Sequence, residues 1–266
     1  MPELAEVEFM ARRLDAWLKG APMTVNVIDP KLDPTGALAS APAERVQRVH
    51  RRAKYAVVEG ENHRWVLHFR MTGKVVRWGG AADEMPRHTR AILHTEDAHV
   101  AFVDMRRFGT FELVPSVQWA TWEASKRLGD EPWPERRPAS WWRERLGSLK
   151  TPIKKALMAQ DRVVGLGNIL ASEVLFQARV SPRRPANTLG DEEWDAVSRA
   201  LHETVGAVLE MQVGDEIAYV NEGASPEAAG FRVYGRAGEP AECCGGPIER
   251  IVESGRSTFW CPNCQR

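Results

Sequence analysis

The chain has 266 residues, of which 43% are hydrophobic and 27% charged, and its 36 basic residues are balanced by 36 acidic ones. This length allows one large or two modest globular domains, and the composition excludes disordered, collagen-like and membrane proteins. Charge interrupts every apolar run well before the ~18 residues that a membrane-spanning helix needs. Because the formal net charge is zero, any nucleic-acid partner must be bound by local basic patches.

The two ends of the chain indicate its compartment. The start, Met1-Pro2-Glu3-Leu4-Ala5-Glu6, is acidic where a secretory signal would be basic and then apolar. All four cysteines lie after residue 242, a clustering that indicates a metal site in a cytosolic chain more than a disulfide framework. We therefore expect a cytoplasmic protein.

Hydrophobic periodicity divides the chain into a sheet region and a helical region. Between Glu3 and Lys19, apolar residues recur at three- and four-residue steps, which predicts an amphipathic helix. From about residue 25 to 114, apolar and polar residues alternate between turn-prone stretches such as Gly79-Gly80, which predicts an antiparallel sheet, in the form of a sandwich. Residues 115–148 are rich in proline and tryptophan and are interpreted as a connector.

Helical spacing dominates the second half of the chain. Helices are predicted over residues 153–160, 168–178 and 191–211. Residues 221–230 are small and polar, which predicts a loop, and the cysteine-bearing tail follows.

The amino terminus can supply a nucleophile. If Met1 is removed, which a small second residue permits, Pro2 becomes a free secondary amine beside Glu3. An α-amino group titrates near ~7.7–8.0, so part of it is unprotonated at pH 7 and can attack a sugar aldehyde carbon to form a Schiff base. The alternative is an ordinary processing context in which Glu3 only favours a helix start.

A basic run and a glycine turn can each bind phosphate. Residues 45–55 carry Arg45, Arg48, Arg51, Arg52 and Lys54, which can contact several phosphates or form the solvated face of a strand. Gly165 and Gly167 let the backbone approach a ligand, and a helix that begins at Asn168 points its first amides at an anion. The alternative for this second segment, which follows Lys150, Lys154 and Lys155, is a plain turn between helices.

The cysteine tail predicts a zinc site with an irregular half. Cys261 and Cys264 have the two-residue gap that lets both thiolates reach one tetrahedral zinc ion. The regular partner position for Cys244 is occupied by Ala241, and the fourth cysteine is the adjacent Cys243. Neighbouring side chains of an extended segment point opposite ways, so this pair would need a distorted turn. The alternative is a three-thiol remnant in a hairpin held by packing.

Two further turns follow predicted strands, at Arg70-Met71-Thr72-Gly73 and at Asp104-Met105-Arg106-Arg107-Phe108-Gly109. Methionine, arginine and phenylalanine on neighbouring turns can fill the gap left when a base is pushed out of a duplex. Core packing and a surface ion pair are the alternative interpretation.

Together these segments resemble the formamidopyrimidine-DNA glycosylase and endonuclease VIII family of base-excision repair enzymes, over nearly the whole chain. The resemblance is carried, in the family's order, by residues 2–8, 51–55, 70–73, 104–109, 153–176, 233–236 and the cysteine tail. Residues 71–73 with 106–109 are similar to the formamidopyrimidine branch.

The resemblance implies an α+β fold with an N-terminal antiparallel β-sandwich and N-terminal helix, a C-terminal helical domain with a helix-two-turn-helix, and a zinc-finger-like β-hairpin. We place the catalytic sandwich at residues 1–115, a connector at 116–148, the helix-two-turn-helix domain at 149–225 and the hairpin at 226–266. One structural Zn²⁺ is expected, bound by Cys243, Cys244, Cys261 and Cys264.

The resemblance also implies roles for individual residues. Pro2 would attack C1′ of the damaged nucleotide and displace the base, Glu3 would act as general acid in opening the sugar, and Glu6 would support the site. Lys54 would contact a phosphate and act as an acid partner, and Arg256 matches the finger arginine tied to phosphate binding and the second elimination. The expected DNA-binding residues are Met71, His88, Arg106, Phe108, Lys150 and Asn168.

Three departures from the family pattern limit what it implies. Ala5 stands where the family usually has proline, and Ala241 replaces the first finger cysteine. Residues 221–231 differ from the loop that closes over an oxidised purine in the formamidopyrimidine branch.

We therefore expect a monomeric bifunctional DNA glycosylase and AP lyase that acts on damaged double-stranded DNA, removes oxidised purines and cuts by β,δ-elimination. Two alternatives remain open. One is an endonuclease VIII-like glycosylase for oxidised pyrimidines, and the other is a non-catalytic damaged-DNA-binding protein.

Overall fold

The computed structural model describes residues 2–79, 83–212, 230–253 and 255–266. The described chain forms two compact units, one built from residues 2–127 and the other from residues 128–211 and those after 229. Within the part of the chain that is described, no helix combines the length and apolarity needed to cross a membrane.

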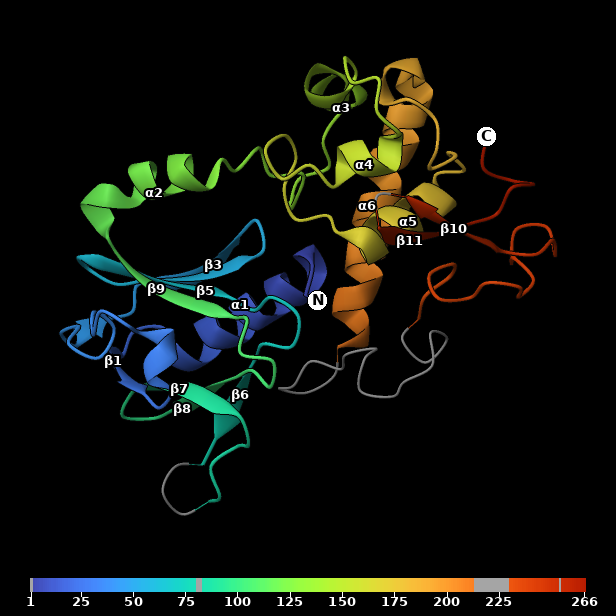
Figure 1. The fold of residues 1–266 in the computed structure, drawn as a ribbon. Helices are drawn as coiled ribbons and strands as arrows, with labels where there is room; N and C mark the ends of the chain where they lie inside the picture. The colour runs from blue at the N-terminus through green and yellow to red at the C-terminus, as the bar shows by residue number, and fades with distance from the viewer. Residues whose placement is uncertain (1, 80–82, 213–229, 254) are drawn as a thin grey trace. The chain divides into compact units, whose positions relative to one another are not determined.

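The first unit contains two antiparallel sheets (Figure 1). The five-stranded sheet has the order β2-β1-β7-β8-β6, and the four-stranded sheet the order β3-β4-β5-β9. The strands are β1 (Pro22–Val27), β2 (Glu44–Arg45), β3 (Arg48–Arg52), β4 (Tyr55–Glu59), β5 (His63–His68), β6 (Lys74–Trp78), β7 (Thr89–His94), β8 (His99–Val103) and β9 (Thr110–Pro115). A short 3-10 turn, η1 (Pro30–Leu32), follows β1.

The core of this unit lies between side chains of both sheets. The ring of Phe102 on β8 meets that of Phe111 on β9 edge-on, with 6.3 Å between ring centroids. Helix α1 (Leu4–Leu18) contacts β3 and β4 of one sheet and β6 of the other. Its apolar positions, such as Leu14 and Leu18, are fully buried, so the periodicity between Glu3 and Lys19 predicted both the helix and its buried face.

The segment interpreted as a connector contains regular structure that the sequence did not predict. A 3-10 turn, η2 (Ser116–Gln118), leads into α2 (Trp119–Lys126), and α3 (Ala139–Leu146) follows later. Each helix has only eight residues, too few for a clear periodicity between prolines. Trp142 of α3 stacks on Trp194 of α6 (Asp191–Met211), and this packing stabilises the short helix.

The second unit is helical up to its last segment. Helices α4 (Ile153–Leu157) and α5 (Asn168–Gln177) are joined by the glycine-containing turn, a short η3 (Ala186–Thr188) follows, and α6 packs against α3 and α5. The chain ends in a two-stranded hairpin of β10 (Glu249–Glu253) and β11 (Arg256–Trp260). The α+β fold predicted from the sequence is therefore confirmed. The loop predicted over residues 221–230 lies outside the described residues, apart from Gly230.

Candidate functional site

The start of α1 is fixed by two reciprocal hydrogen bonds. The backbone N–H of Glu3 donates to Glu6 Oε2 at 2.9 Å, and the backbone N–H of Glu6 donates to the Glu3 carboxylate. Such a capping box satisfies donors that a helix start leaves without partners. Pro2 and Glu3 are both buried, so the two bonds hold the predicted nucleophile and its neighbouring acid in one backbone conformation.

The carboxyl group of Glu6 is less acidic than an ordinary glutamate. Burial raises the pKa of Glu6, and the nearby negative charge of Glu3 raises it further. Both effects disfavour the ionised form. Glu6 is therefore placed to buffer charge at the site while it orders the backbone of Glu3.

Lys54 lies in the tight turn between β3 and β4, which Arg52 and Tyr55 close as a cross-strand pair. The first turn residue, Ala53, has φ of 54°, a left-handed conformation that is uncommon outside glycine. Only 8% of the Lys54 surface is exposed. The turn therefore presents a largely buried cation.

Two contacts set the direction of α1 along this hairpin. The backbone N–H of Val49 donates to Asp15 Oδ1 at 2.6 Å, and Arg51 Nε donates to Glu8 Oε2 at 3.2 Å. Helix residues nearer the chain start thus meet strand residues nearer the turn. The predicted nucleophile and Lys54 consequently lie at the same end of the first unit.

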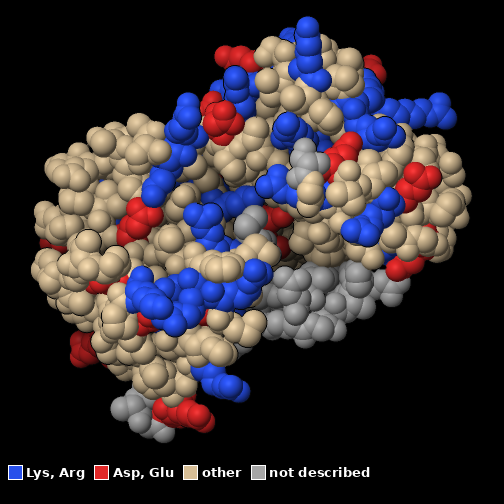
Figure 2. Space-filling view, viewed as in Figure 1, with Lys and Arg blue, Asp and Glu red and all other residues tan. Residues whose placement is uncertain are grey.

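Three arginines of the basic run are neutralised by the protein's own carboxylates. Ion pairs join Arg48 to Glu59, Arg51 to Glu8 and Arg52 to Glu123. The Arg51 side chain is only 3% exposed, so it faces the interior. Figure 2 likewise shows acidic side chains directly beside several of the basic ones on the visible face. The run is therefore in large part structural, and Lys54 lies in the turn that ends it.

Met71, Arg106 and Phe108, the residues predicted to fill the gap left by an extruded base, are called the wedge residues. They lie on two turns at strand ends of the first unit, the wedge turns. Phe108 is 54% exposed, and the guanidinium of Arg106 lies over its ring, 4.8 Å from the centroid. His88 and Arg106 are exposed and Met71 is half-buried. An apolar or planar group at such a position is available to a ligand.

Sequence reasoning missed the ion pairs that hold one of these turns. Asp29 accepts hydrogen bonds from Arg107 Nε at 3.0 Å and from Arg90 Nε at 2.9 Å. Burial opposes ionisation of Asp29, but the bonds from Arg107 and Arg90 outweigh it and lower the pKa of this carboxyl. The partners are far apart in the chain, so no local pattern could have found them.

In the second unit, Asn168 and Arg256 line one pocket of about 320 Å³. Its lining residues come from α4, the start of α5 and the hairpin, and they are Pro152, Lys154, Lys155, Met158, Asn168, Glu253, Arg256 and Thr258. Lysine, arginine and the start of a ten-residue helix together favour an anion. Lys150 is exposed before α4 and does not line this pocket.

The side chain of Asn168 binds the finger hairpin. Its Nδ2 donates to Ser257 O at 3.0 Å and to Tyr234 Oη at 3.2 Å, while Oδ1 is buried without a hydrogen-bond partner. Both amide hydrogens are therefore engaged within the protein. In this structure Asn168 fixes the hairpin next to Arg256.

Gln160, which the sequence analysis did not single out, and Lys154, which it placed before a phosphate-binding turn, complete this arrangement. Gln160 Nε2 donates to Leu166 O, and Gln160 Oε1 accepts from Gly165 N–H, each at 2.9 Å. Gly165 has φ of 92°, which favours glycine. The buried Lys154 donates from Nζ to Thr258 Oγ1 at 2.8 Å, which attaches α4 to β11.

The four cysteines form one cluster. Their Sγ atoms lie within 4.8 Å of one another, with 3.5 Å between Cys244 and Cys261 and 4.0 Å between Cys243 and Cys244. Four Zn–S bonds of about 2.3 Å in a tetrahedron place the sulfurs about 3.8 Å apart. The residues fit one structural zinc ion.

The adjacent cysteines converge because their segment is a turn and not an extended strand. Backbone N–H groups of Cys244 and Gly245 donate to Ala241 O at 3.2 and 2.7 Å, and Gly245 has φ of 70°. In such a turn, successive side chains are not opposed. Ala241 is itself buried in a small apolar cluster with residues such as Phe259, so its methyl group supports the finger from inside.

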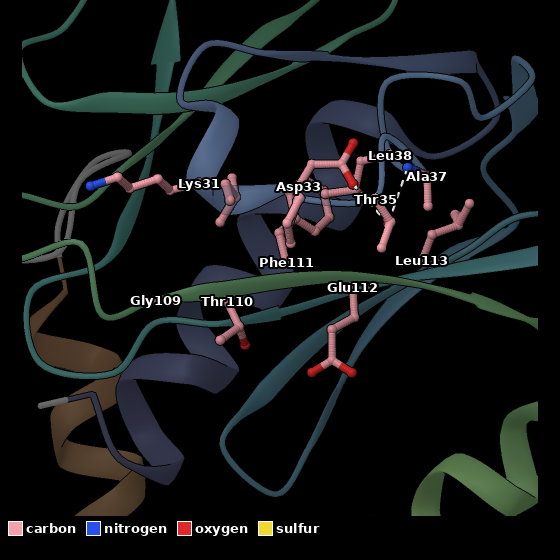
Figure 3. Close-up of a pocket in the computed structure, with 12 residues that line it drawn as sticks. Lys31, Asp33, Thr35, Ala37, Leu38, Gly109, Thr110, Phe111, Glu112 and Leu113 are labelled. Carbon is pink, nitrogen blue, oxygen red and sulfur yellow. Dashed lines mark hydrogen bonds between the residues drawn. The ribbon is translucent and has the colours of Figure 1, made fainter.

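Two other pockets contain none of the predicted site residues. One, of about 440 Å³, lies between the loop after β1 and strand β9, where Phe111 and Leu113 face Asp33 and Thr35 while Glu112 points away (Figure 3). Another, of about 460 Å³, lies at the β7–β8 turn beside His99. The predicted residues thus divide into a set at the turns of the first unit and a set at the pocket and finger of the second.

Family models match the chain in three successive parts. The formamidopyrimidine-DNA glycosylase N-terminal domain matches residues 1–111, the H2TH domain of the same glycosylase matches residues 128–218, and a zinc finger found in FPG and IleRS matches residues 243–266. The last match and the cysteine cluster confirm the predicted zinc finger.

Curated relatives are similar over their full lengths. The formamidopyrimidine-DNA glycosylases of Exiguobacterium sp. and Sphingopyxis alaskensis are 37% and 36% identical to this chain, each with 100% of both chains covered. A solved structure of MutM in complex with carbocyclic 8-oxo-G containing DNA superposes with a TM-score of 0.85 at 28% identity, covering 100% of each chain. A complex between Lactococcus lactis Fpg and DNA containing an abasic site gives a TM-score of 0.85 at 28% identity, covering 99% of each chain. The chain belongs to the formamidopyrimidine-DNA glycosylase family.

Proposed function

We propose that this chain is a bifunctional DNA glycosylase and AP lyase of base-excision repair that removes oxidised purines from double-stranded DNA. The observation that carries the proposal is the reciprocal capping of Glu3 and Glu6, which fixes Pro2 at the end of the unit where Lys54 lies. A module that only binds DNA has no use for a low-pKa amine held beside an acid. Similarity to glycosylases along the full chain supports the same conclusion.

In the first half of the reaction, the amine of Pro2 attacks C1′ of the damaged nucleotide. A C1′–N bond forms, the bond to the base breaks, and the base leaves with its electron pair and takes up the proton that the Pro2 nitrogen loses. Glu3 gives a proton to O4′ as the C1′–O4′ bond opens, which leaves an iminium ion on Pro2. Glu6 keeps the backbone of Glu3 in place.

In the second half, the iminium ion acidifies the C2′ proton. Loss of that proton breaks the C3′–O bond in β-elimination, and a δ-elimination then breaks the C5′–O bond. Lys54 contacts a phosphate and acts as an acid partner, and Arg256 binds a phosphate during the second elimination. The pocket that Arg256 shares with the start of α5 supports this role, because both favour an anion.

We assign DNA binding to both units. Met71, Arg106 and Phe108 fill the space of the extruded nucleotide, and His88 contacts the duplex. Extrusion costs a few kcal/mol, which stacking of inserted groups offsets in part. Asn168 and Lys150 bind from the second unit. Zinc, when bound, supplies cohesion in the hairpin that carries Arg256.

Residues 1–115 act as the catalytic part, residues 149–225 and 226–266 hold DNA, and the chain acts as a cytoplasmic monomer. Relatives of known structure are described in complexes with 8-oxo-G and abasic-site DNA, and these are the substrates that we assign to this chain. Light scattering with and without a duplex tests the monomer.

The decisive test is borohydride trapping on 8-oxoguanine and abasic duplexes, with the native chain and a Pro2→Ala variant. We expect a covalent adduct with the native chain and none with the variant, and mass spectrometry should find Met1 removed. An adduct that survives the substitution at full yield would contradict the proposal. A duplex with an oxidised pyrimidine decides between the two lesion classes.

A further inference from the structure

Asp104 is a buried carboxylate at the point where three segments with predicted DNA-binding residues meet. It is 1% exposed and lies directly after β8. Its Oδ1 accepts a hydrogen bond from Thr72 Oγ1 at 2.5 Å, and its Oδ2 accepts one from Gly109 N–H at 2.7 Å. Its backbone N–H donates to His88 O at 3.0 Å. One residue thus contacts the turn of Met71, the turn that ends at Gly109, and His88.

Thr72 extends this link to the backbone of Arg106. A hydroxyl group has a single hydrogen, and the Thr72 hydroxyl gives it to Asp104. The same oxygen then accepts the backbone N–H of Arg106 at 3.2 Å. Hydrogen bonds to a carboxylate are stronger than those between neutral groups, so the pair ties the two wedge turns directly together.

Three residues in the segments around Asp104 have a left-handed backbone conformation, which is unfavourable outside glycine. Arg70, His88 and Arg107 have φ of 53°, 64° and 58°. Non-glycine residues in this left-handed backbone region are energetically unfavourable and persist only where the surroundings impose them. Each lies in a segment that Asp104 contacts through the bonds described above. The network therefore imposes a shape that these turns would not adopt alone.

The backbone of both wedge turns is closely packed at their last residues, Gly73 and Gly109. A Cβ atom on Gly109 would lie 2.7 Å from Phe102 Cζ and 3.0 Å from Asp104 Oδ2. A Cβ atom on Gly73 would lie 2.5 Å from Phe69 O. The anchors are therefore buried and tightly packed, while Phe108, which they carry, remains 54% exposed.

We propose that Asp104, with Thr72 as its relay, is a positioning residue that holds Met71, His88 and Arg106 in the geometry required for insertion into the duplex. The inference rests on the proposed function, because it concerns the step in which a damaged nucleotide leaves the helix. Immobilising a side chain on binding costs free energy. Turns that are already fixed avoid much of that cost.

The test separates extrusion of a base from chemistry at the sugar. Asp104→Asn, Thr72→Val and Thr72→Ser are compared on an 8-oxoguanine duplex, as single-turnover excision at saturating enzyme, and on an abasic duplex, as borohydride trapping. We expect Asp104→Asn and Thr72→Val to slow excision about tenfold or more, as loss of a charge-assisted hydrogen bond implies. Trapping should fall less than about threefold, because no stacked base has to be removed.

Thr72→Ser keeps the hydroxyl group and should restore excision to within about twofold of the native rate. A 2-aminopurine base beside the lesion reports insertion by its fluorescence rise, which should slow with excision in the Val variant and recover in the Ser variant. Equal losses on both duplexes, or native excision by Thr72→Val, would overturn the inference. If Asp104→Asn does not fold, the Val and Ser pair decides. Failure of the proposed function is seen separately, as trapping that Pro2→Ala leaves intact.

Discussion

The wedge turns of the first unit and the finger hairpin of the second are both exposed structures on buried anchors, but the anchors differ in kind. The wedge turns rest on large buried side chains, among them Phe69 and Phe102, and on the carboxylate of Asp104. Beneath the finger, the described residues form a small cluster of six buried side chains, one of which is the cysteine Cys261. No residue of β10 is fully buried.

This difference indicates where each region obtains its stability. A small apolar cluster rarely holds a fold by itself, and small modules add a metal or disulfides. A buried carboxylate with several donors instead needs a large core around it to exclude water. We therefore expect the stability of the finger to depend on bound metal, and the stability of the wedge turns to depend on protonation of buried groups.

Removal of zinc should have the largest effect. Structural zinc contributes about 10–16 kcal/mol to folding in small zinc modules, so a strong chelator should open the hairpin of β10 and β11 while the sandwich stays folded. Hydrogen exchange should show loss of protection in residues 249–260 alone. Protection that persists without metal would mean that the apolar cluster suffices.

Two cysteine variants sharpen this prediction. Cys261→Ser removes a fully buried thiol, and Cys243→Ser removes one of the adjacent pair. Both should lower the zinc content of the purified protein, because all four sulfurs belong to one cluster. Full zinc occupancy in Cys243→Ser would show that the turn at Ala241 supplies only one ligand.

Acid should act on the wedge turns through His68. Burial, followed by the charges of Arg70 and Lys54, lowers the pKa of His68 to about 3, from an ordinary 6.5. Between pH 6.5 and 3, the unfolded chain therefore binds a proton at His68 that the folded chain does not bind. The free energy of unfolding is highest above pH 6.5 and falls as the pH drops toward 3. The complete loss is roughly 5 kcal/mol, and about 3 kcal/mol of it should be gone at pH 4.

The measurement is the free energy of unfolding by denaturant at pH 7 and pH 4. Nδ1 of His68 accepts the backbone N–H of Arg70 at 3.0 Å, and an asparagine oxygen can replace that acceptor without titrating. His68→Asn should therefore flatten the acid dependence, whereas His88→Asn, at an exposed position, should leave it unchanged. Identical slopes in all three proteins would contradict the prediction.

The finger also has an anchor that does not depend on metal. Lys154 donates to Thr258 Oγ1 and to Ser257 O. Lys154→Met keeps the length of the side chain but removes both hydrogen bonds, while Ser257 O keeps the one from Asn168 Nδ2. We expect a loss of about 1–3 kcal/mol, measured as local opening of β11 by hydrogen exchange. The matched control is Lys155→Met, since Lys155 is exposed in the same pocket. Equal effects in both would assign the loss to charge in general.

The sequence predicted the parts of the fold that follow from a long regular pattern. The helix at residues 4–18 and the long helix at 191–211 repeat their apolar spacing over several turns. The sequence pattern did not predict helices α2 and α3, because each has few buried residues. Tertiary packing such as that of Trp142 on Trp194 stabilises them.

The residues proposed for chemistry could be chosen from the sequence because they stand in short motifs. Their anchors could not, because each anchor is a contact between distant segments, such as Asp29 with Arg107 or Lys154 with Thr258. The run at residues 45–55 shows the same limit, since only the structure reveals the carboxylates that neutralise it. Convergence of Cys243 and Cys244 likewise depended on a turn that adjacent cysteines do not encode.

Glu6 should give the smallest effect, and with the opposite sign to His68. Its pKa is raised above an ordinary 4.5, so the folded chain binds the proton more tightly, and the stabilisation present below that value is lost as the pH rises through the folded pKa. A glutamine in place of Glu6 can still accept the hydrogen bond from the Glu3 N–H but does not titrate. The free energy of unfolding of the native chain, relative to that of Glu6→Gln, should therefore fall as the pH rises from 4.5 through the folded pKa. Glu61→Gln, at an exposed position, is the control. If the stability of the native chain relative to the Glu6→Gln variant instead rises with pH, the ionised form of Glu6 is the one that the helix start stabilises. The site would then carry two negative charges beside Pro2.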